Sequence, residues 1–287
     1  SPARRARPAR PRPSTSRPST SRPSTSRIVS ADGTTIAFEE KGEGPALILV
    51  DGALSTGTSG SKAGLVELLA PQLRVYSFDR RGRGDSGDTP PYALEREIED
   101  IEALVEHAGG SAFLYGHSSG ACLVLEAALR LGEKATKLAL YEAPYEDDPA
   151  DRPAWAEYLR QLADALASNR RGDAVALFMA YVGTPPDQVA AMRQAPSWAQ
   201  LEAVAPTLAY DHAGILGESR AIPAARLAAV GVPTLAMYGG AGPPSMAGAA
   251  RTLSRTLPLG ELRVLEGQTH AVQPAALAPV LVEFFLG

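Results

Sequence analysis

The sequence predicts an α/β fold: a mostly parallel, doubly wound sheet that carries a helical insertion. From residue 28 onward, short apolar runs typical of strands alternate with longer segments of helical spacing. Such alternation is typical of parallel sheets whose two faces are covered by helices. Between residues 145 and 222 the strand pattern disappears, and alanine and other helix formers dominate. The chain has 287 residues and 45% of them are apolar, which is enough for one large domain with an insertion.

Seven segments have the pattern of strands. The run Ala46–Val50 is continuously apolar, as expected for a strand that is buried on both faces. In chain order, the predicted strands are Thr34–Phe38, Ala46–Val50, Arg74–Phe78, Ser111–Tyr115, Lys137–Tyr141, Pro233–Tyr238 and Glu261–Leu265. The predicted helices around them are Leu94–His107, Ala121–Arg130 and Pro274–Leu286.

We expect three parts in the chain. Residues 28–145 and 231–287 form the α/β core, and residues 146–230 form a helical cap over the pocket. Residues 1–27 form an Arg/Pro/Ser/Thr-rich tail with three Arg-Pro-Ser-Thr-Ser repeats, eight arginines and no acid. Frequent proline and the scarcity of apolar residues predict that the tail is disordered. A polybasic tail can bind nucleic acid or an anionic membrane, but we favour an extension without a selected role.

Charge and composition exclude several classes of function. The tail holds eight of the 28 basic residues, so the remaining chain has 20 basic and 32 acidic residues, which argues against nucleic-acid binding. The sequence has no run of 18 apolar residues, so we expect no membrane span. No apolar segment follows the arginines, so we expect no secretory signal. The single cysteine excludes an internal disulfide, and no spacing suggests a metal site. We therefore expect a cytoplasmic protein that acts on a small molecule without a cofactor; the oligomeric state is not indicated.

Residues 116–120 read Gly-His-Ser-Ser-Gly, which matches the pattern G-x-S-x-G between a predicted strand and a predicted helix. This arrangement is a nucleophile elbow, in which Ser118 sits on a sharp, strained turn that exposes its hydroxyl. Glycines flank the serine because side chains there would collide with the neighbouring elements. The helix that follows points its free N–H groups and its positive dipole end at the site. The pattern predicts that Ser118 is a nucleophile.

A serine hydroxyl needs a base within hydrogen-bond reach, and that base is usually a histidine. Of the four histidines, His270 lies in the loop between the last predicted strand and the last helix. In open parallel sheets, ligands bind at the carboxyl ends of the strands, where both Ser118 and His270 are expected. By contrast, His107 ends a surface helix, and the side chain of His117 is expected to point away from the nucleophile. We predict that His270 is the base.

From about residue 28 to its end, the chain resembles the α/β-hydrolase family. Three motifs carry the resemblance: Asp-Gly-Ala at 51–53, Asp-Arg-Arg-Gly-Arg-Gly-Asp-Ser at 79–86, and the elbow at 116–120. The resemblance implies an α/β-hydrolase fold with a Ser-His-acid triad. It also implies an oxyanion hole formed by the backbone N–H groups of Ala53 and Ser119. The family usually has histidine where this chain has Asp51, so the side-chain packing of that loop departs from the pattern.

The third member of the triad also departs from the usual pattern. The family most often places an acid after the strand that follows the cap, but residues 239–245 contain no carboxylate here. Some members carry the acid one strand earlier, after the strand that follows the elbow helix. Glu142 holds that place, so it is the candidate that orients His270. The alternative is that Glu142 is an ordinary strand-end carboxylate and that the site is a Ser-His dyad assisted by Ser245.

The predicted cap is rich in aromatic residues. We single out Tyr181, Tyr210 and His212 as candidates to line an apolar substrate cavity, the alternative being that such residues pack the core of the cap itself. Residues 82–87 also match G-x-G-x-x-G, but Pro90 and Pro91 intervene before any helix, which argues against a dinucleotide site.

These features predict a serine hydrolase that cleaves a small to medium apolar ester, thioester or lactone through an acyl-enzyme on Ser118. The alternative on the same scaffold is a C–C hydrolase, lyase or cyclase of secondary metabolism, in which the serine only donates a hydrogen bond. A non-catalytic ligand receptor is a third possibility, against which the presence of both Ser118 and His270 argues. An epoxide hydrolase or dehalogenase of the aspartate-nucleophile kind is disfavoured because the elbow carries serine.

Overall fold

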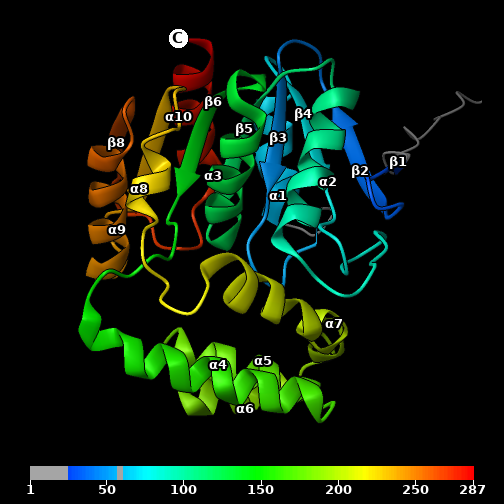
Figure 1. Ribbon diagram of the computed structural model, residues 1–287, viewed down its shortest axis with the longest axis vertical. Coiled ribbons are helices and arrows are strands. Elements are labelled where there is room, and N and C mark those ends of the chain that lie inside the picture. The colour runs from blue at the N-terminus through cyan, green and yellow to red at the C-terminus, as the bar shows by residue number, and fades with distance from the viewer. Residues whose placement is uncertain (1–24, 57–60) are drawn as a thin grey trace, which may run out of the picture.

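The computed structural model describes residues 25–56 and 61–287, and its centre is an eight-stranded sheet (Figure 1). The strand order is β1-β2-β4-β3-β5-β6-β7-β8; β2 pairs antiparallel with β1 and β4, and the other pairs are parallel. The fold class predicted from the sequence is confirmed. The strands are β1 (Ser26–Val29), β2 (Thr35–Lys41), β3 (Ala46–Val50), β4 (Arg74–Phe78), β5 (Ala112–His117), β6 (Ala135–Tyr141), β7 (Thr234–Gly239) and β8 (Gly260–Leu265).

Helices cover both faces of the sheet, and each face has its own hydrophobic core. One core contains residues of α1 (Ser61–Leu69) and α10 (Pro274–Leu286). The other core contains residues of α2 (Leu94–His107), α3 (Ser119–Leu131) and α9 (Pro244–Thr256). All five residues of β3 are buried, as its continuous apolar run predicts.

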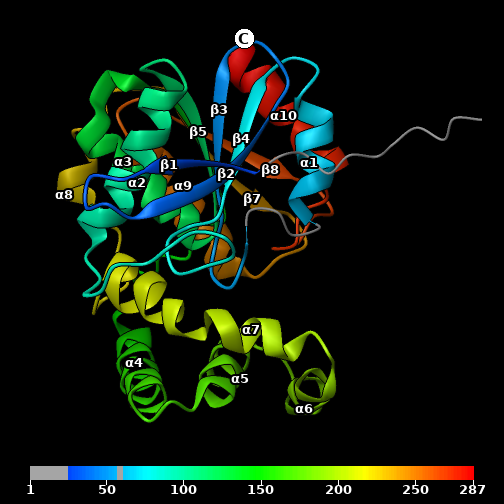
Figure 2. The same ribbon diagram turned by 90° about the vertical axis from the view of Figure 1, so that its right-hand side faces the viewer.

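The segment between β6 and β7 contains helices and no strand; the structure describes all of its residues. Figures 1 and 2 show α4 to α7 as a layer at one end of the sheet, below the core in both views. A π-helix, η4, follows them and packs against α3. The helices of the segment are η2 (Pro149–Asp151), α4 (Arg152–Ala167), α5 (Arg171–Tyr181), α6 (Pro186–Gln194), α7 (Trp198–Val204), η3 (Ala205–Thr207), η4 (Tyr210–Leu216) and α8 (Ala224–Leu227).

The structure differs from the predictions at the start of the chain. Strand β1 begins at Ser26, so its first two residues come from the end of the predicted tail. Residues 1–24, which make up most of the predicted tail, lie outside the described residues. Helices α1 and α9 and the short 3₁₀ helix η1 (Gly132–Lys134) were also not predicted from the sequence. In the described part of the chain, no helix is long and apolar enough to cross a membrane.

The glycines of the elbow lie where there is no room for a side chain. A Cβ atom on Gly120 would lie 2.3 Å from the carbonyl oxygen of Val50 and 2.5 Å from that of Asp51. A Cβ atom on Gly116 would lie 2.5 Å from the Cα of Ala121. Because each clash is with backbone, a side chain at either position would push the elbow away from β3 or from its own helix.

We expect Gly120→Ala to lower the free energy of unfolding by roughly 1–3 kcal/mol, because the new methyl group overpacks the contact with β3. The matched control is Gly248→Ala in α9, where a Cβ atom would meet nothing within 4 Å. The free energy of unfolding of that variant should rise by about 0.5–1 kcal/mol, because alanine has a higher helix propensity than glycine. Urea unfolding measures both. Equal stability of the two variants would contradict the close approach.

Candidate active site

Ser118 lies on the turn between β5 and α3. Its φ of 56° and ψ of −130° are a strained conformation for a residue with a side chain. The Ser118 N–H donates to the carbonyl of Tyr141 at the end of β6, at 2.9 Å. On the other side lies Gly52, where an added Cβ atom would be 3.0 Å from the Cβ of Ser118. The predicted nucleophile therefore sits between the loop after β3 and the end of β6.

The structure brings His270 and Glu142 together. His270 Nδ1 lies 2.5 Å from Glu142 Oε2, although the two residues are 128 positions apart. The other carboxylate oxygen of Glu142 accepts a hydrogen bond from the N–H of Gly239 at 2.9 Å. Glu142 is only 1% exposed, whereas 43% of the His270 side chain is exposed. Because Nδ1 faces the carboxylate, Nε2 of a neutral His270 ring is left to accept a proton.

Three successive carbonyl groups of the loop that carries His270 accept hydrogen bonds. The donors to residues 268, 269 and 270 are the N–H of Ala241 at 2.9 Å, the hydroxyl of Tyr141 at 2.6 Å and Nε2 of His117 at 2.9 Å. The rings of His117 and His270 lie 4.9 Å apart between centroids. Since a carbonyl only accepts, His117 must carry its proton on Nε2. These bonds fix the backbone from which the imidazole of His270 projects.

Burial, together with the neighbouring His270, lowers the pKa of His117 to about 4. His117 is therefore neutral near pH 7, and its only N–H is the one that faces the carbonyl of His270. The side chain next to the predicted nucleophile thus holds the backbone of the predicted base, His270.

Two buried arginines from the loop after β4 hold the loop after β3, which contains the predicted oxyanion donor Ala53. Arg80 Nη1 donates to the carbonyl of Asp51 at 3.1 Å, and Arg83 Nη1 donates to the carbonyl of Gly52 at 3.1 Å. Each arginine is 1% exposed. The position of the loop after β3 thus depends on two side chains from the neighbouring strand connection.

A fully buried carboxylate, Asp211, joins these arginines to the elbow. It lies in the π-helix η4, and segments of π-helix are frequent at functional sites. Asp211 accepts from Arg80 at 2.6 Å, from Arg83 at 2.7 Å and from the hydroxyl of Ser119 at 2.7 Å. Although burial alone would raise the pKa of Asp211, the two arginines lower it below its usual range, so this side chain is a carboxylate.

Asp211 was not predicted from the sequence. Its signal is indirect: arginines at 80, 81 and 83 follow a buried strand, so carboxylates must lie near them in the fold. The sequence does not show which ones. Arg80 also forms a bidentate salt bridge with Glu97 of α2, with N–O distances of 2.8 and 2.7 Å, and Glu97 balances its charge.

Asp51, which stands where the α/β-hydrolase pattern has histidine, forms a buried ion pair with Lys62 of α1. Burial raises the pKa of Asp51 and the charge of Lys62 lowers it. The pair connects the loop after β3 to the helix that follows it. Asp51, which replaces the histidine of the family pattern, thus has the charge of Lys62 as its partner.

Of the predicted cap residues, His212 and Tyr181 belong to an aromatic cluster that also includes Trp155, Tyr158 and Phe178. His212 is 5% exposed, and its Nδ1 lies 2.8 Å from the hydroxyl of Tyr158. Tyr181 stacks on Tyr158 with 4.6 Å between ring centroids, and the guanidinium of Arg220 lies 5.5 Å from the Tyr181 ring. His212 follows Asp211 in the chain, so this cluster continues from the residue that contacts the elbow.

Tyr210 is placed differently. Its ring stacks on Tyr92 with 4.2 Å between centroids, and its hydroxyl donates to Asp88 Oδ2 at 2.5 Å. Both partners belong to the connection between β4 and α2. Tyr210 therefore ties the helical segment to the core on the side of that connection.

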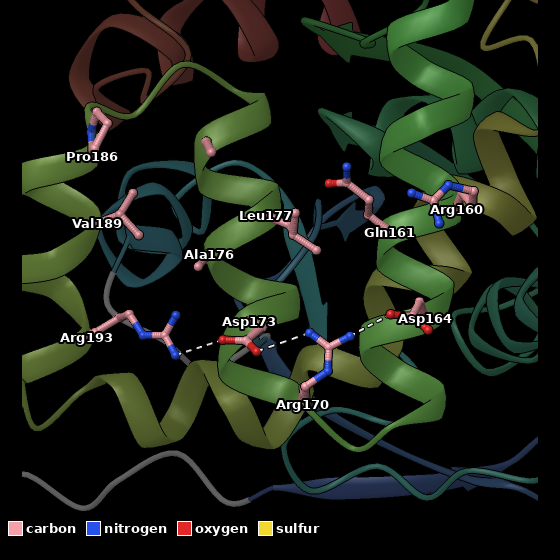
Figure 3. Close-up of a pocket in the computed structure, with 11 residues that line it drawn as sticks. Arg160, Gln161, Asp164, Arg170, Asp173, Ala176, Leu177, Pro186, Val189 and Arg193 are labelled. Atoms are coloured by element: carbon pink, nitrogen blue, oxygen red, sulfur yellow. Dashed lines mark hydrogen bonds and ion pairs between the residues drawn. The ribbon is translucent and has the colours of Figure 1, made fainter.

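A hollow of about 530 Å³ lies among α4, α5 and α6 (Figure 3). None of its lining residues is a predicted site residue. Four of its five charged side chains pair with one another: Arg170 pairs with Asp164 and Asp173 at 2.6 and 3.2 Å, and Arg193 pairs with Asp173 at 3.0 Å. The fifth, Arg160, pairs with Glu157 at 2.7 Å. The geometry around Ser118, rather than this hollow, identifies the candidate site.

Within residues 25–56 and 61–287, no group of three or more His, Cys, Asp and Glu side chains is arranged to hold a metal ion. The single cysteine, Cys122, is buried in α3, and burial raises the pKa of its thiol.

The comparison with protein families agrees with this fold. A family model described as "Alpha/beta hydrolase family" matches residues 56–280. The chain belongs to the alpha/beta hydrolase family. It is therefore an α/β-fold hydrolase, and the resemblance proposed from the elbow and the two loop motifs is confirmed.

Solved structures of this family resemble the chain over most of its length. An alpha/beta hydrolase from Sphaerobacter thermophilus is 52% identical with a TM-score of 0.80, and the match covers 91% of this chain and all of that one. A thermophilic esterase from Thermogutta terrifontis, 23% identical with a TM-score of 0.69, shares the fold; the match covers 92% and 98% of the two chains.

A sequence relative matches a smaller part of the chain. The proline iminopeptidase PfmaB of Pestalotiopsis fici is 27% identical over 117 residues, which are 39% of this chain and 42% of that protein.

The buried histidines should make the stability of this α/β hydrolase depend on pH. Burial lowers the pKa of His212, like that of His117, to about 4 from an ordinary value of 6.5. Between pH 6.5 and 4 the unfolded chain binds protons that the folded chain does not. As the pH falls from 6.5 to 4, the free energy of unfolding should therefore decrease by on the order of 3 kcal/mol for each histidine.

The variant His212→Gln lacks one of these titrations. We expect the stability difference between wild type and this variant to shrink by on the order of 3 kcal/mol from pH 7 to pH 4, as measured by urea unfolding. A difference that does not change with pH would show that His212 is not held neutral in the folded protein.

Proposed function

We propose that this hydrolase is a serine hydrolase with a Ser118-His270-Glu142 triad. Ser118 attacks the substrate carbonyl, and His270 accepts the serine proton on Nε2. Glu142 holds the ring by Nδ1 and stabilises the imidazolium. The backbone N–H groups of Ala53 and Ser119 stabilise the negative oxygen that develops on the substrate. His270 then returns the proton to the leaving group, and a water molecule releases the acyl group by the same steps in reverse order.

The 2.5 Å contact between His270 Nδ1 and Glu142 Oε2 carries this proposal. A buried carboxylate on Nδ1 is the arrangement that prepares Nε2 to act as a general base. The backbone bonds to residues 268–270 support it, because one of them comes from His117, the neighbour of Ser118. The strained φ of Ser118 adds further support, since backbone strain in proteins concentrates at functional sites.

We further propose that residues 146–230 act as a cap and that the substrate is a small to medium apolar ester, thioester or lactone. The half-buried rings of Phe178 and Tyr181 support an apolar lining on the segment that reaches the elbow through Asp211. His212 is buried, which favours the alternative that it packs the core of the cap. For Tyr210, the contacts with Asp88 and Tyr92 favour a role in attaching the cap over one in contacting substrate.

The alternative of a C–C hydrolase, lyase or cyclase drew on the absence of an acid after β7. The contact of Glu142 with His270 argues against this alternative. The same contact argues against a slower Ser-His dyad. The serine hydrolase is therefore the function that we propose.

The first test uses the nucleophile. A fluorophosphonate probe should label the wild-type protein and not Ser118→Ala, because only the serine oxygen can displace fluoride from phosphorus. Hydrolysis of p-nitrophenyl butyrate, followed by the absorbance of nitrophenolate, should be lost in the same variant. Equal labelling of the two proteins would overturn the proposal. Labelling without ester turnover would favour the lyase or cyclase alternative.

The second test uses the orienting acid. Glu142→Gln should lower kcat for p-nitrophenyl butyrate by roughly 10⁴-fold with little change in KM, because the wrong tautomer of His270 is then favoured. The matched control is Glu146→Gln, four residues further along the same loop, which should stay within about two-fold of wild type. A Glu142→Gln variant of nearly normal kcat would show that Glu142 is only a structural carboxylate.

A further inference from the structure

The network around Asp211 contacts both backbone segments that are proposed to form the oxyanion hole. On one side, the hydroxyl of Ser119 donates to Asp211 Oδ1 at 2.7 Å. On the other side, Arg83 donates to Asp211 Oδ2 through Nη2 at 2.7 Å and to the carbonyl of Gly52 through Nη1 at 3.1 Å. One carboxylate is thus connected to the residue before Ala53 and to Ser119 itself.

The bond from Arg83 to Gly52 determines where the N–H of Ala53 points. The carbonyl of Gly52 and the N–H of Ala53 belong to the same planar peptide unit, and in a trans peptide they point in opposite directions. This peptide is not among the cis bonds of the described chain. Holding the carbonyl of Gly52 toward Arg83 therefore points the N–H of Ala53 away from Arg83. Because Gly52 lies against Ser118, this donor belongs to the loop beside the proposed nucleophile.

The buried charges hold the network together. Arg83 and Asp211 are 1% and 0% exposed, and a buried charge without its partner costs several kcal/mol. Neither side chain can leave the other without that cost. Arg80 adds a second clamp, because it binds Asp211 and the carbonyl of Asp51.

We propose that Arg83 and Asp211 are positioning residues that orient the two N–H donors of the oxyanion hole, Arg83 through the carbonyl of Gly52 and Asp211 through the hydroxyl of Ser119. This inference rests on the proposed serine-hydrolase function. It also makes the helical segment part of the catalytic machinery, since Asp211 belongs to η4. The hole is complete only when η4 packs on α3.

The test is the double variant Arg83→Met/Asp211→Leu, which replaces the ion pair by apolar side chains of similar volume and leaves neither charge unpaired. Its kcat for p-nitrophenyl butyrate should fall by about 10- to 100-fold, less than the roughly 10²–10³ that follows removal of a donor. KM should stay within about two-fold. The inhibition constant of butylboronic acid, which forms a tetrahedral adduct on the serine, should rise in proportion to the loss of kcat/KM.

The matched control is Arg81→Met/Asp100→Leu. Arg81 is buried in the same loop and forms a bidentate salt bridge with Asp100 at 2.8 and 2.7 Å. Its other partners are Asp32 and the carbonyl of Arg96, which belong to neither proposed oxyanion segment. This variant should keep its kcat and its boronic acid affinity, whatever its stability. If both double variants lose boronic acid affinity to the same degree, the effect is general loosening and the inference is wrong.

Two single variants decide the question if circular dichroism shows that the double variant does not fold. Asp211→Asn and Ser119→Ala keep the volume of the site, and both should weaken boronic acid binding with little change in KM. Unchanged binding in both would overturn the inference. Failure of the proposed function is recognised separately, because wild-type protein would then neither hydrolyse the ester nor react with the fluorophosphonate.

Discussion

The close approach of backbone around the elbow is the constraint on which the rest of the site depends. The carbonyls of Val50 and Asp51 lie where a side chain on Gly120 would be, so the start of α3 rests directly on the end of β3. This contact places the two proposed oxyanion segments next to each other, and Ser118, the proposed nucleophile, lies between them with a strained φ. The bond from Ser118 N–H to the end of β6 then brings the strand that leads to Glu142 to the same point.

Buried charge is the second organising element. Three arginines in one loop are almost fully buried, which is tolerable only because carboxylates meet each of them with good geometry. Such pairs add little to stability compared with apolar packing, and they are costly to break. Their contribution here is geometric: Arg80 and Arg83 transmit the position of Asp211 to the carbonyls of the loop after β3. Specific placement, rather than stability, is what this loop gains from its charges.

The parts of the fold that could be predicted from the sequence are those with a local signal. The apolar run of β3 and the glycines around Ser118 are such signals, and the rule that parallel strands end at one edge predicted that Ser118 and His270 lie near each other. Glu142 was predicted from the resemblance to the α/β-hydrolase family. Strand β1 was missed because it is an edge strand with little buried surface and no apolar pattern. Asp211 was missed because its partners Ser119 and Arg80 lie 92 and 131 positions away, and no local pattern encodes such a contact.

The location of Asp211 has a consequence for protein engineering by domain exchange. Caps are natural units to graft between members of one scaffold, since they are contiguous insertions. In this chain, a graft that lacks an equivalent of Asp211 would leave Arg83 buried without a counter-ion and would remove the hydrogen-bond acceptor of the Ser119 hydroxyl. A chimaera would then inherit a new binding surface together with a damaged core. Exchange points placed before residue 210, which keep η4 with its parent, avoid that outcome.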